Sequence, residues 1–244
     1  MDPNIRYSKN QCPQTPEEAA EMRHIPYREA VVSLLYLAIA THPDIVFPIG
    51  ILSRFMDNLG QVHWEGVKHV LRYLAGMRNW ALIYGTKVKG LEGFTDVDSA
   101  TQEHRHAITG YTFLINGGAI SWSSKKQEIV TLSTAKSEYV ATIDAAKETI
   151  WLRQFIGEVF QPLTNPIPLY SDLQAAITPT HDRSYHARTK HIDIWYHFIQ
   201  FVVNNGTINL IYSPTDNMAA NTLMKALPNI KVKHFAFALG LQST

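Results

Sequence analysis

Three acidic residues occupy positions at which a metal site could form. Asp96 falls at the end of a strand predicted over residues 91–97, Glu138 lies on a helix predicted from residue 133, and Asp172 follows a strand predicted over residues 167–171. Carboxylate oxygens are hard ligands for magnesium, and two ions about 4 Å apart can activate a water and stabilise the leaving oxygen of a phosphodiester. The trio therefore suggests hydrolysis of a nucleic-acid backbone. An aspartate after a strand is, however, more often a solvated turn residue or a helix cap, and the pattern alone favours that interpretation.

A cluster of basic residues precedes the next predicted helix, which spans residues 189–203. It contains His181, Arg183, His186, Arg188, Lys190 and His191. These side chains, together with the backbone amides of the helix start, could hold a phosphate backbone. The alternative is a solvated loop whose histidines pack against the sheet, and the residues alone favour it. Lys125 and Lys126 follow a predicted strand, where paired lysines usually mark an exposed edge.

The elements that must position these residues alternate between strands and helices. Strands are predicted over residues 91–97, 107–115, 119–123, 167–171 and 207–212, and helices over 133–160, with a break near Thr149, over 189–203 and at the end of the chain. Asn116, Gly117 and Gly118 form the turn of a hairpin. The order βββαβαβα implies an α/β fold with a mixed five-stranded sheet, in which helical crossovers reach the last two strands.

The chain before residue 80 has a different periodicity. Residues 27–41 and 64–74 place apolar side chains on one face of a helix, so residues 27–80 are predicted to form a small helical segment. His42, Pro43 and Asp44 resemble a helix start, and Pro48 should weaken the helix that follows. Residues 1–26 are expected to be extended or irregular.

Composition restricts the class of protein without revealing its function. The 244 residues are 45% hydrophobic and 18% charged, which excludes a disordered or fibrous chain. Cys12 is the single cysteine, so no intramolecular disulfide is possible, and neither a signal peptide nor a membrane span is predicted. We therefore expect an intracellular protein. The net charge of +1 gives no global attraction for nucleic acid, so local basic clusters would have to hold it.

Several ordered motifs resemble the ribonuclease H domain of copia-type retrotransposon polyproteins. They are Phe94-Thr95-Asp96-Val97-Asp98, Thr109-Gly110-Tyr111, Ser121-Trp122-Ser123-Ser124-Lys125-Lys126-Gln127, Ser137-Glu138-Tyr139-Val140-Ala141, Leu169-Tyr170-Ser171-Asp172 and His186-Ala187-Arg188-Thr189-Lys190-His191-Ile192-Asp193. Upstream, residues 27–76 resemble the segment that follows the polymerase core of the same polyprotein. No segment resembles the paired-aspartate motif of the polymerase, so reverse transcriptase activity is not expected of this chain.

The resemblance implies a ribonuclease H-like domain over residues 91–241 that cleaves the RNA strand of an RNA/DNA hybrid. It implies that Asp96, Glu138 and Asp172 hold two Mg²⁺ or Mn²⁺ ions, with Asn221 in the fourth ligand position. The substrate would contact Arg183, His186, Arg188, Lys190 and His191. The reverse transcriptase core of the parent polyprotein would be a further partner.

Asn221 is the main departure from the family, which has aspartate at this position in a terminal-helix segment. An amide brings no negative charge, so affinity for the second metal should fall. Asp98 and Asp216 are the nearest acidic candidates to compensate, and their positions suggest surface carboxylates. Two alternatives to the enzyme therefore stay open: an inactive remnant or repurposed module that binds nucleic acid, and a structural fragment whose N-terminal helices once packed on the polymerase core.

Overall fold

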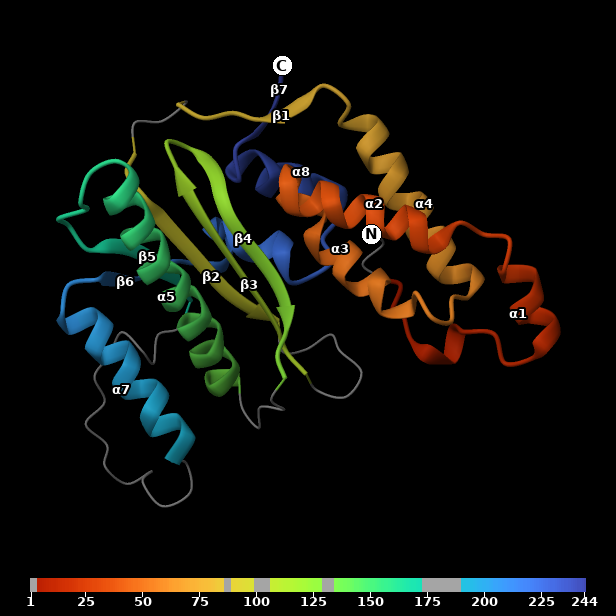
Figure 1. The fold of residues 1–244 in the computed structure, drawn as a ribbon, viewed down its shortest axis with the longest axis horizontal. Coiled ribbons are helices and arrows are strands. Elements are labelled where there is room, and N and C mark those ends of the chain that lie inside the picture. The colour runs from red at the N-terminus through yellow and green to blue at the C-terminus, as the bar shows by residue number, and fades with distance from the viewer. Residues whose placement is uncertain (1–3, 86–88, 99–105, 129–133, 173–189) are drawn as a thin grey trace.

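A five-stranded sheet forms the centre of the structure, a computed structural model that describes residues 4–85, 89–98, 106–128, 134–172 and 190–244. The strands are β2 (Glu92–Asp98), β3 (Ile108–Ile115), β4 (Gly118–Lys126), β5 (Ile167–Ser171) and β6 (Ile208–Tyr212). Their spatial order is β4-β3-β2-β5-β6, with β2, β3 and β4 antiparallel and β5 and β6 parallel to their neighbours (Figure 1). This confirms the α/β fold class and the mixed sheet.

The hairpin between β3 and β4 turns at the predicted residues. Asn116 and Gly117 both have positive φ, 51° and 87°, as a two-residue turn of this handedness requires. The turn fixes the register of the pairs nearest to it, Ile115 with Gly118 and Leu114 with Ala119, and a bulge shifts the register between Leu114 and Phe113.

Two long helices, α5 (Thr134–Val159) and α7 (Lys190–Asn204), cover one face of the sheet (Figure 1). Their apolar side chains, among them Ile143 and Ile199, share a buried cluster with Phe113 and Leu169 of the sheet. The expected break of α5 near Thr149 does not occur. The Thr149 hydroxyl donates to the Ala145 carbonyl one turn earlier, which satisfies this buried polar group inside a continuous helix.

The opposite face of the sheet is covered by short C-terminal elements. They are the 3₁₀ helices η6 (Thr215–Asn217) and η7 (Ala219–Leu223) and the helix α8 (Asn229–Ala238). The family resemblance placed Asn221 in a terminal-helix segment, and that expectation is wrong because Asn221 lies on η7. Met218 before η7 is extended, and Pro228 caps α8, so the chain cannot form one helix through this region.

The N-terminal part of the chain packs beside this second face as a helical layer. It contains η1 (Lys9–Gln11), α1 (Pro16–Met22), α2 (Tyr27–Ala40), η2 (Pro43–Ile45), α3 (Val46–Leu52), η3 (Ser53–Phe55) and α4 (Gln61–Gly76) (Figure 1). The indole nitrogen of Trp122 in β4 donates to the Ala38 carbonyl at 2.8 Å and ties this layer to the sheet. Pro48 is accommodated in the first turn of α3, where its missing N–H breaks no helical hydrogen bond.

Residues 1–26 were expected to be irregular, yet α1 forms there. Thr15 caps it by accepting a hydrogen bond from the Glu18 N–H, and Pro16 occupies the first helical position. A second sheet that the sequence did not predict pairs β1 (Trp80–Leu82) with β7 (Leu241–Ser243). Within the described residues, no helix combines the length and apolar character needed to cross a membrane.

Candidate active site

Asp96 lies near the end of the central strand β2 and is almost fully buried, with 4% of its surface exposed. One carboxylate oxygen, Oδ1, accepts a hydrogen bond from the Val97 N–H at 2.7 Å. The other, Oδ2, is buried and has no hydrogen-bond partner among the described residues. A buried carboxylate oxygen without a donor is costly, so this atom is a candidate for binding a cation.

Glu138 and Asp172 lie within electrostatic reach of Asp96. Burial raises the pKa of Asp96 to about 7, and the charges of Asp172 and Glu138 add to the increase. Burial and the charge of Asp172 raise the pKa of Glu138, and burial raises that of Asp172. The negative charges of Asp172 and Glu138 therefore act on Asp96, and a cation bound near Asp96 would relieve this repulsion.

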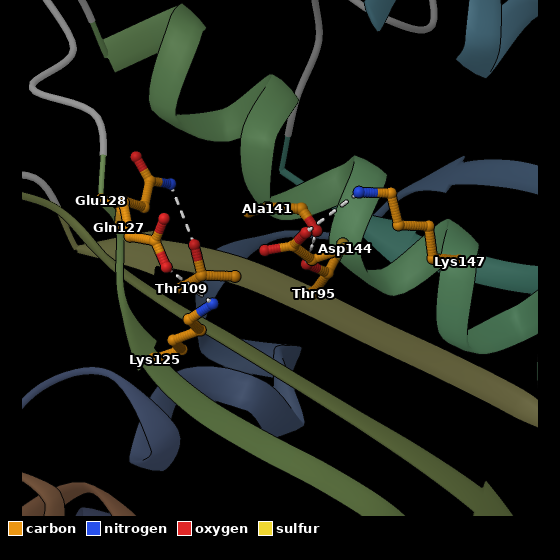
Figure 2. Close-up of polar contacts among 8 residues, drawn as sticks. All are labelled: Thr95, Thr109, Lys125, Gln127, Glu128, Ala141, Asp144 and Lys147. Atoms are coloured by element: carbon orange, nitrogen blue, oxygen red, sulfur yellow. Dashed lines mark hydrogen bonds and ion pairs between the residues drawn. The ribbon is translucent and has the colours of Figure 1, made fainter.

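Two buried polar contacts hold the start of α5, and with it Glu138, against the sheet. The Thr95 hydroxyl donates to the Ala141 carbonyl at 3.2 Å. The Gln127 amide donates at 2.9 Å to the Thr109 hydroxyl (Figure 2). It also donates at 2.9 Å to the Ser137 carbonyl, which adjoins Glu138. This role of Gln127 could not be predicted from the sequence, because Thr109 and Ser137 are 18 and 10 residues away and only the fold brings them to it.

Asn221 approaches the site because β3 has a glycine beside Asp96. Gly110 is the register partner of Asp96, and a Cβ there would lie 3.0 Å from the Leu223 Cβ and 3.2 Å from the Ala220 carbonyl oxygen. Asn221 lies between these two residues and is 2% exposed. Its amide nitrogen donates to the Thr215 carbonyl, while its Oδ1 has no partner among the described residues.

Two further charged residues stand near the carboxylates. Lys225, just after η7, lowers the pKa of Asp96 and Asp172 by its positive charge, a contribution that the sequence analysis missed. Asp98 was expected to be a surface carboxylate, and this is wrong, since it is only 9% exposed. It shares a strand face with Asp96, because alternate side chains of a strand point to the same side. The side chain of Asp216 lies outside the described part of the structure.

The donor set fits a hard divalent cation, although the arrangement is open. Asp96 Oδ2 and Asn221 Oδ1 are buried oxygens that lack hydrogen-bond donors among the described residues, and carboxylate and amide oxygens suit magnesium or manganese. Among the described residues, no three His, Cys, Asp or Glu side chains are close enough to one another to hold a metal ion. Closure of the carboxylates around a cation would therefore have to accompany its binding.

Most of the predicted substrate contacts cannot be placed. Arg183, His186 and Arg188 lie outside the described residues, and Lys190 and His191 belong to α7 with side chains that are not described. Lys125 forms an ion pair with Glu128 at 3.4 Å (Figure 2). The pair is largely exposed, so it leaves Lys125 accessible to a phosphate that competes with Glu128.

Two of the known proteins that are similar to this chain differ greatly in length. The chain is 40% identical over 241 residues to the retrovirus-related Pol polyprotein from transposon TNT 1-94 of Nicotiana tabacum, covering 98% of this chain and 18% of the polyprotein. It is also 40% identical over 135 residues to the secreted RxLR effector protein 161 of Plasmopara viticola, covering 54% of this chain and 94% of that protein. The chain thus spans about a fifth of the tobacco polyprotein. No family model matches it.

Among solved structures, LC11-RNase H1 in complex with RNA/DNA hybrid is similar with a TM-score of 0.41 and 17% sequence identity. The similarity covers 55% of this chain and 93% of that one.

Proposed function

We propose that this chain, which belongs to the retrovirus-related Pol polyproteins of copia-type transposons, is a metal-dependent endonuclease that hydrolyses the RNA strand of RNA/DNA hybrids. The observation that carries the proposal is the buried Oδ2 of Asp96, which has no donor among the described residues and whose carboxyl group feels the charges of Asp172 and Glu138. Isolated surface carboxylates would show neither the repulsion nor the unsatisfied atom.

The acidic side chains and Asn221 would hold magnesium or manganese ions, which when bound activate a water and stabilise the leaving oxygen of the phosphodiester. The protein holds the side chains that would bind the ions in position. Asp96 is fixed by the central strand and by the Val97 N–H, and Glu138 by the contacts that Gln127 and Thr95 make with the start of α5. Lys225 offsets part of the negative charge of Asp96 and Asp172.

A second candidate is a protein that binds the hybrid without cutting it. Asn221 favours this candidate, since its amide donates to the Thr215 carbonyl and supplies no charge to the site. The open arrangement of the carboxylates agrees with it, because no three of the described His, Cys, Asp or Glu side chains form a ready metal site.

The two candidates are separated by cleavage and binding of a labelled RNA/DNA hybrid, measured in magnesium and in manganese. For an enzyme, Glu138→Gln should reduce cleavage at least about a hundredfold, because a metal ligand contributes several kcal/mol to the transition state. Glu158→Gln is the matched control, since Glu158 is an exposed glutamate of the same helix. Hybrid binding without cleavage by the unaltered chain, in both metals, would establish the second candidate instead.

A further inference from the structure

A cavity of about 420 Å³ lies between the N-terminal helical layer and the C-terminal segment. Its wall is formed by η2, α3 and α4 on one side and by η7, the residues after it, and α8 on the other. This volume is within the range of pockets that bind small organic molecules, roughly 300–1,000 Å³. The cavity shares Lys225 with the surroundings of the carboxylates, and the proposed nuclease activity gives its other lining residues no role.

A buried carboxyl group, Asp44, forms one end of the cavity wall and is 3% exposed. The Tyr73 hydroxyl donates to its Oδ2, whereas Oδ1 is buried and finds no hydrogen-bond donor of normal geometry among the described residues. Burial raises the pKa of Asp44, and the Tyr73 hydrogen bond, the charge of His42 and the backbone N–H groups of Asp44 and Ile45 oppose this increase. Because Asp44 Oδ1 is already removed from water and has no donor, a ligand that offers it an N–H or O–H group would form a stabilising hydrogen bond.

Basic side chains form another part of the wall. Arg72 and Lys225 line it from opposite sides, Arg72 on α4 and Lys225 after η7, and His69 adds a third basic residue. Arginine and lysine bind phosphate and carboxylate groups through charge-assisted hydrogen bonds. The same charges disfavour a cationic ligand, so the donor that meets Asp44 should be a neutral N–H or O–H group.

The remaining wall is apolar and suited to the faces of a ring. Phe47 and Pro48 of α3, Val70 of α4 and Val232 of α8 contribute to it. We infer that the cavity binds one nucleoside monophosphate unit, with an amino group of its base donating to Asp44 and its phosphate contacting Arg72 and Lys225. The unit is either a free nucleotide or the 5′-terminal nucleotide of a strand. This inference does not depend on the nuclease activity.

Calorimetric titration of the full chain with two nucleotides tests the contact to Asp44. Adenosine monophosphate and purine riboside monophosphate differ only in the amino group, so the first should bind about tenfold more tightly if that group fills the vacant acceptor. In Asp44→Asn the amide oxygen can still accept from Tyr73, and the amide nitrogen then offers a donor to the cavity. The preference should disappear or reverse in this variant.

The phosphate contact is tested by Arg72→Gln, which should weaken binding of adenosine monophosphate about tenfold or more. Arg72 is exposed, so the variant should fold, and Arg78→Gln at another exposed arginine outside the cavity is the matched control. Cleavage of the hybrid should be unchanged in Arg72→Gln, which keeps failure of this inference distinct from failure of the nuclease proposal.

An oligonucleotide that begins with 5′-phosphoadenosine distinguishes the two sources of the ligand. If it competes with adenosine monophosphate, a strand end can enter, and if it does not, the cavity accepts the free nucleotide. The inference is overturned if neither nucleotide binds, if inorganic phosphate binds as tightly as adenosine monophosphate, or if Arg72→Gln and Arg78→Gln weaken binding equally. Should Asp44→Asn fail to fold, the comparison of the two nucleotides on the unaltered chain still decides the role of the amino group.

Discussion

Gly110 stands directly opposite Asp96 in the pairing of β3 with β2, and η7 packs against the position where a side chain would be. A methyl group at Gly110 would lie 3.0 Å from the Leu223 Cβ and 3.2 Å from the Ala220 carbonyl oxygen. Both atoms belong to the element that carries Asn221. The close approach of β3 and η7 therefore sets the distance between Asn221 and the strand of Asp96.

Gly110→Ala should displace η7 and lower stability by about 1–3 kcal/mol, the usual cost of overpacking a core. Cleavage or hybrid binding should fall with it, because Asn221 moves relative to Asp96. Gly50→Ala is the control, since a Cβ there meets no atom within 4 Å and alanine favours the helix. Thermal unfolding and cleavage of both variants measure the effect, and equal melting temperatures would contradict the packing role of Gly110.

His63 should make the stability of the helical layer depend on pH. It is fully buried, accepts a hydrogen bond from the Gly60 N–H at Nδ1 and stacks on Phe55 with ring centres 3.9 Å apart. Burial lowers its pKa below the ordinary value of 6.5, although the Ser8 backbone opposes this. Between the two pKa values the unfolded chain binds a proton that the folded chain does not, so stability is complete above about 6.5 and falls as the pH decreases towards the folded pKa.

The measurement is the melting temperature of the unaltered chain and of His63→Gln at about pH 7.5 and about pH 5.5. The unaltered chain should lose more stability on acidification than the variant, whose amide does not titrate. A loss of the same size in both proteins would show that groups other than His63 govern the acid response.

The sequence predicted the sheet because each central strand carries local information. The β3–β4 hairpin has Asn116 and Gly117 at its turn, and the apolar side chains of β5 form a short run bounded by polar residues. The β1–β7 pair could not be predicted in this way, since each strand has three residues and Trp80 pairs with Ser243 from the far end of the chain. Only tertiary packing specifies such short strands.

The acidic residues of the proposed site were predicted from motif and position, whereas their environment could not be predicted. The proximity of Lys225 to Asp96 depends on the path of the chain after η7, a region that was expected to be part of a helix, and the burial of Asp98 depends on tertiary packing. The α1 helix was missed although Thr15 and Pro16 form a recognisable helix start, because its seven residues bury no side chain and show no apolar stripe.

Asp96→Asn should stabilise the chain in the absence of divalent metal. The folded-state pKa of Asp96 is about 7 and the ordinary value is 3.8, so between these values the folded chain holds a proton that the unfolded chain has lost. The stability that this proton provides is complete below about 3.8 and is lost as the pH rises through about 7. At about pH 8 in a chelator, the variant should therefore exceed the unaltered chain by on the order of 3 kcal/mol.

Magnesium should reduce or reverse this difference, because it stabilises the ionised carboxylate of the unaltered chain and has less to bind in the variant. The melting temperature of each protein is measured in chelator and in magnesium, near pH 8 and near pH 4, which gives four values for each. Asp57→Asn serves as the control, since the Asp57 side chain is 99% exposed. An Asp96→Asn chain that is less stable than the unaltered one in the chelator would show that Asp96 is not under charge repulsion.

Asn221→Asp should reveal whether the amide has a structural role or only weakens the metal site. The amide nitrogen of Asn221 donates to the Thr215 carbonyl, and a carboxylate would place a second acceptor against that oxygen. In a chelator the variant should lose about 1–3 kcal/mol of stability, the penalty for an unpaired buried polar group. Magnesium should restore much of this loss and cleavage should increase, because the added charge completes the set of acidic ligands.

Asn79→Asp, at an exposed asparagine, controls for the change in net charge. A variant that melts lower in both conditions and cuts no better would mean that Asn221 is retained for its contact with Thr215.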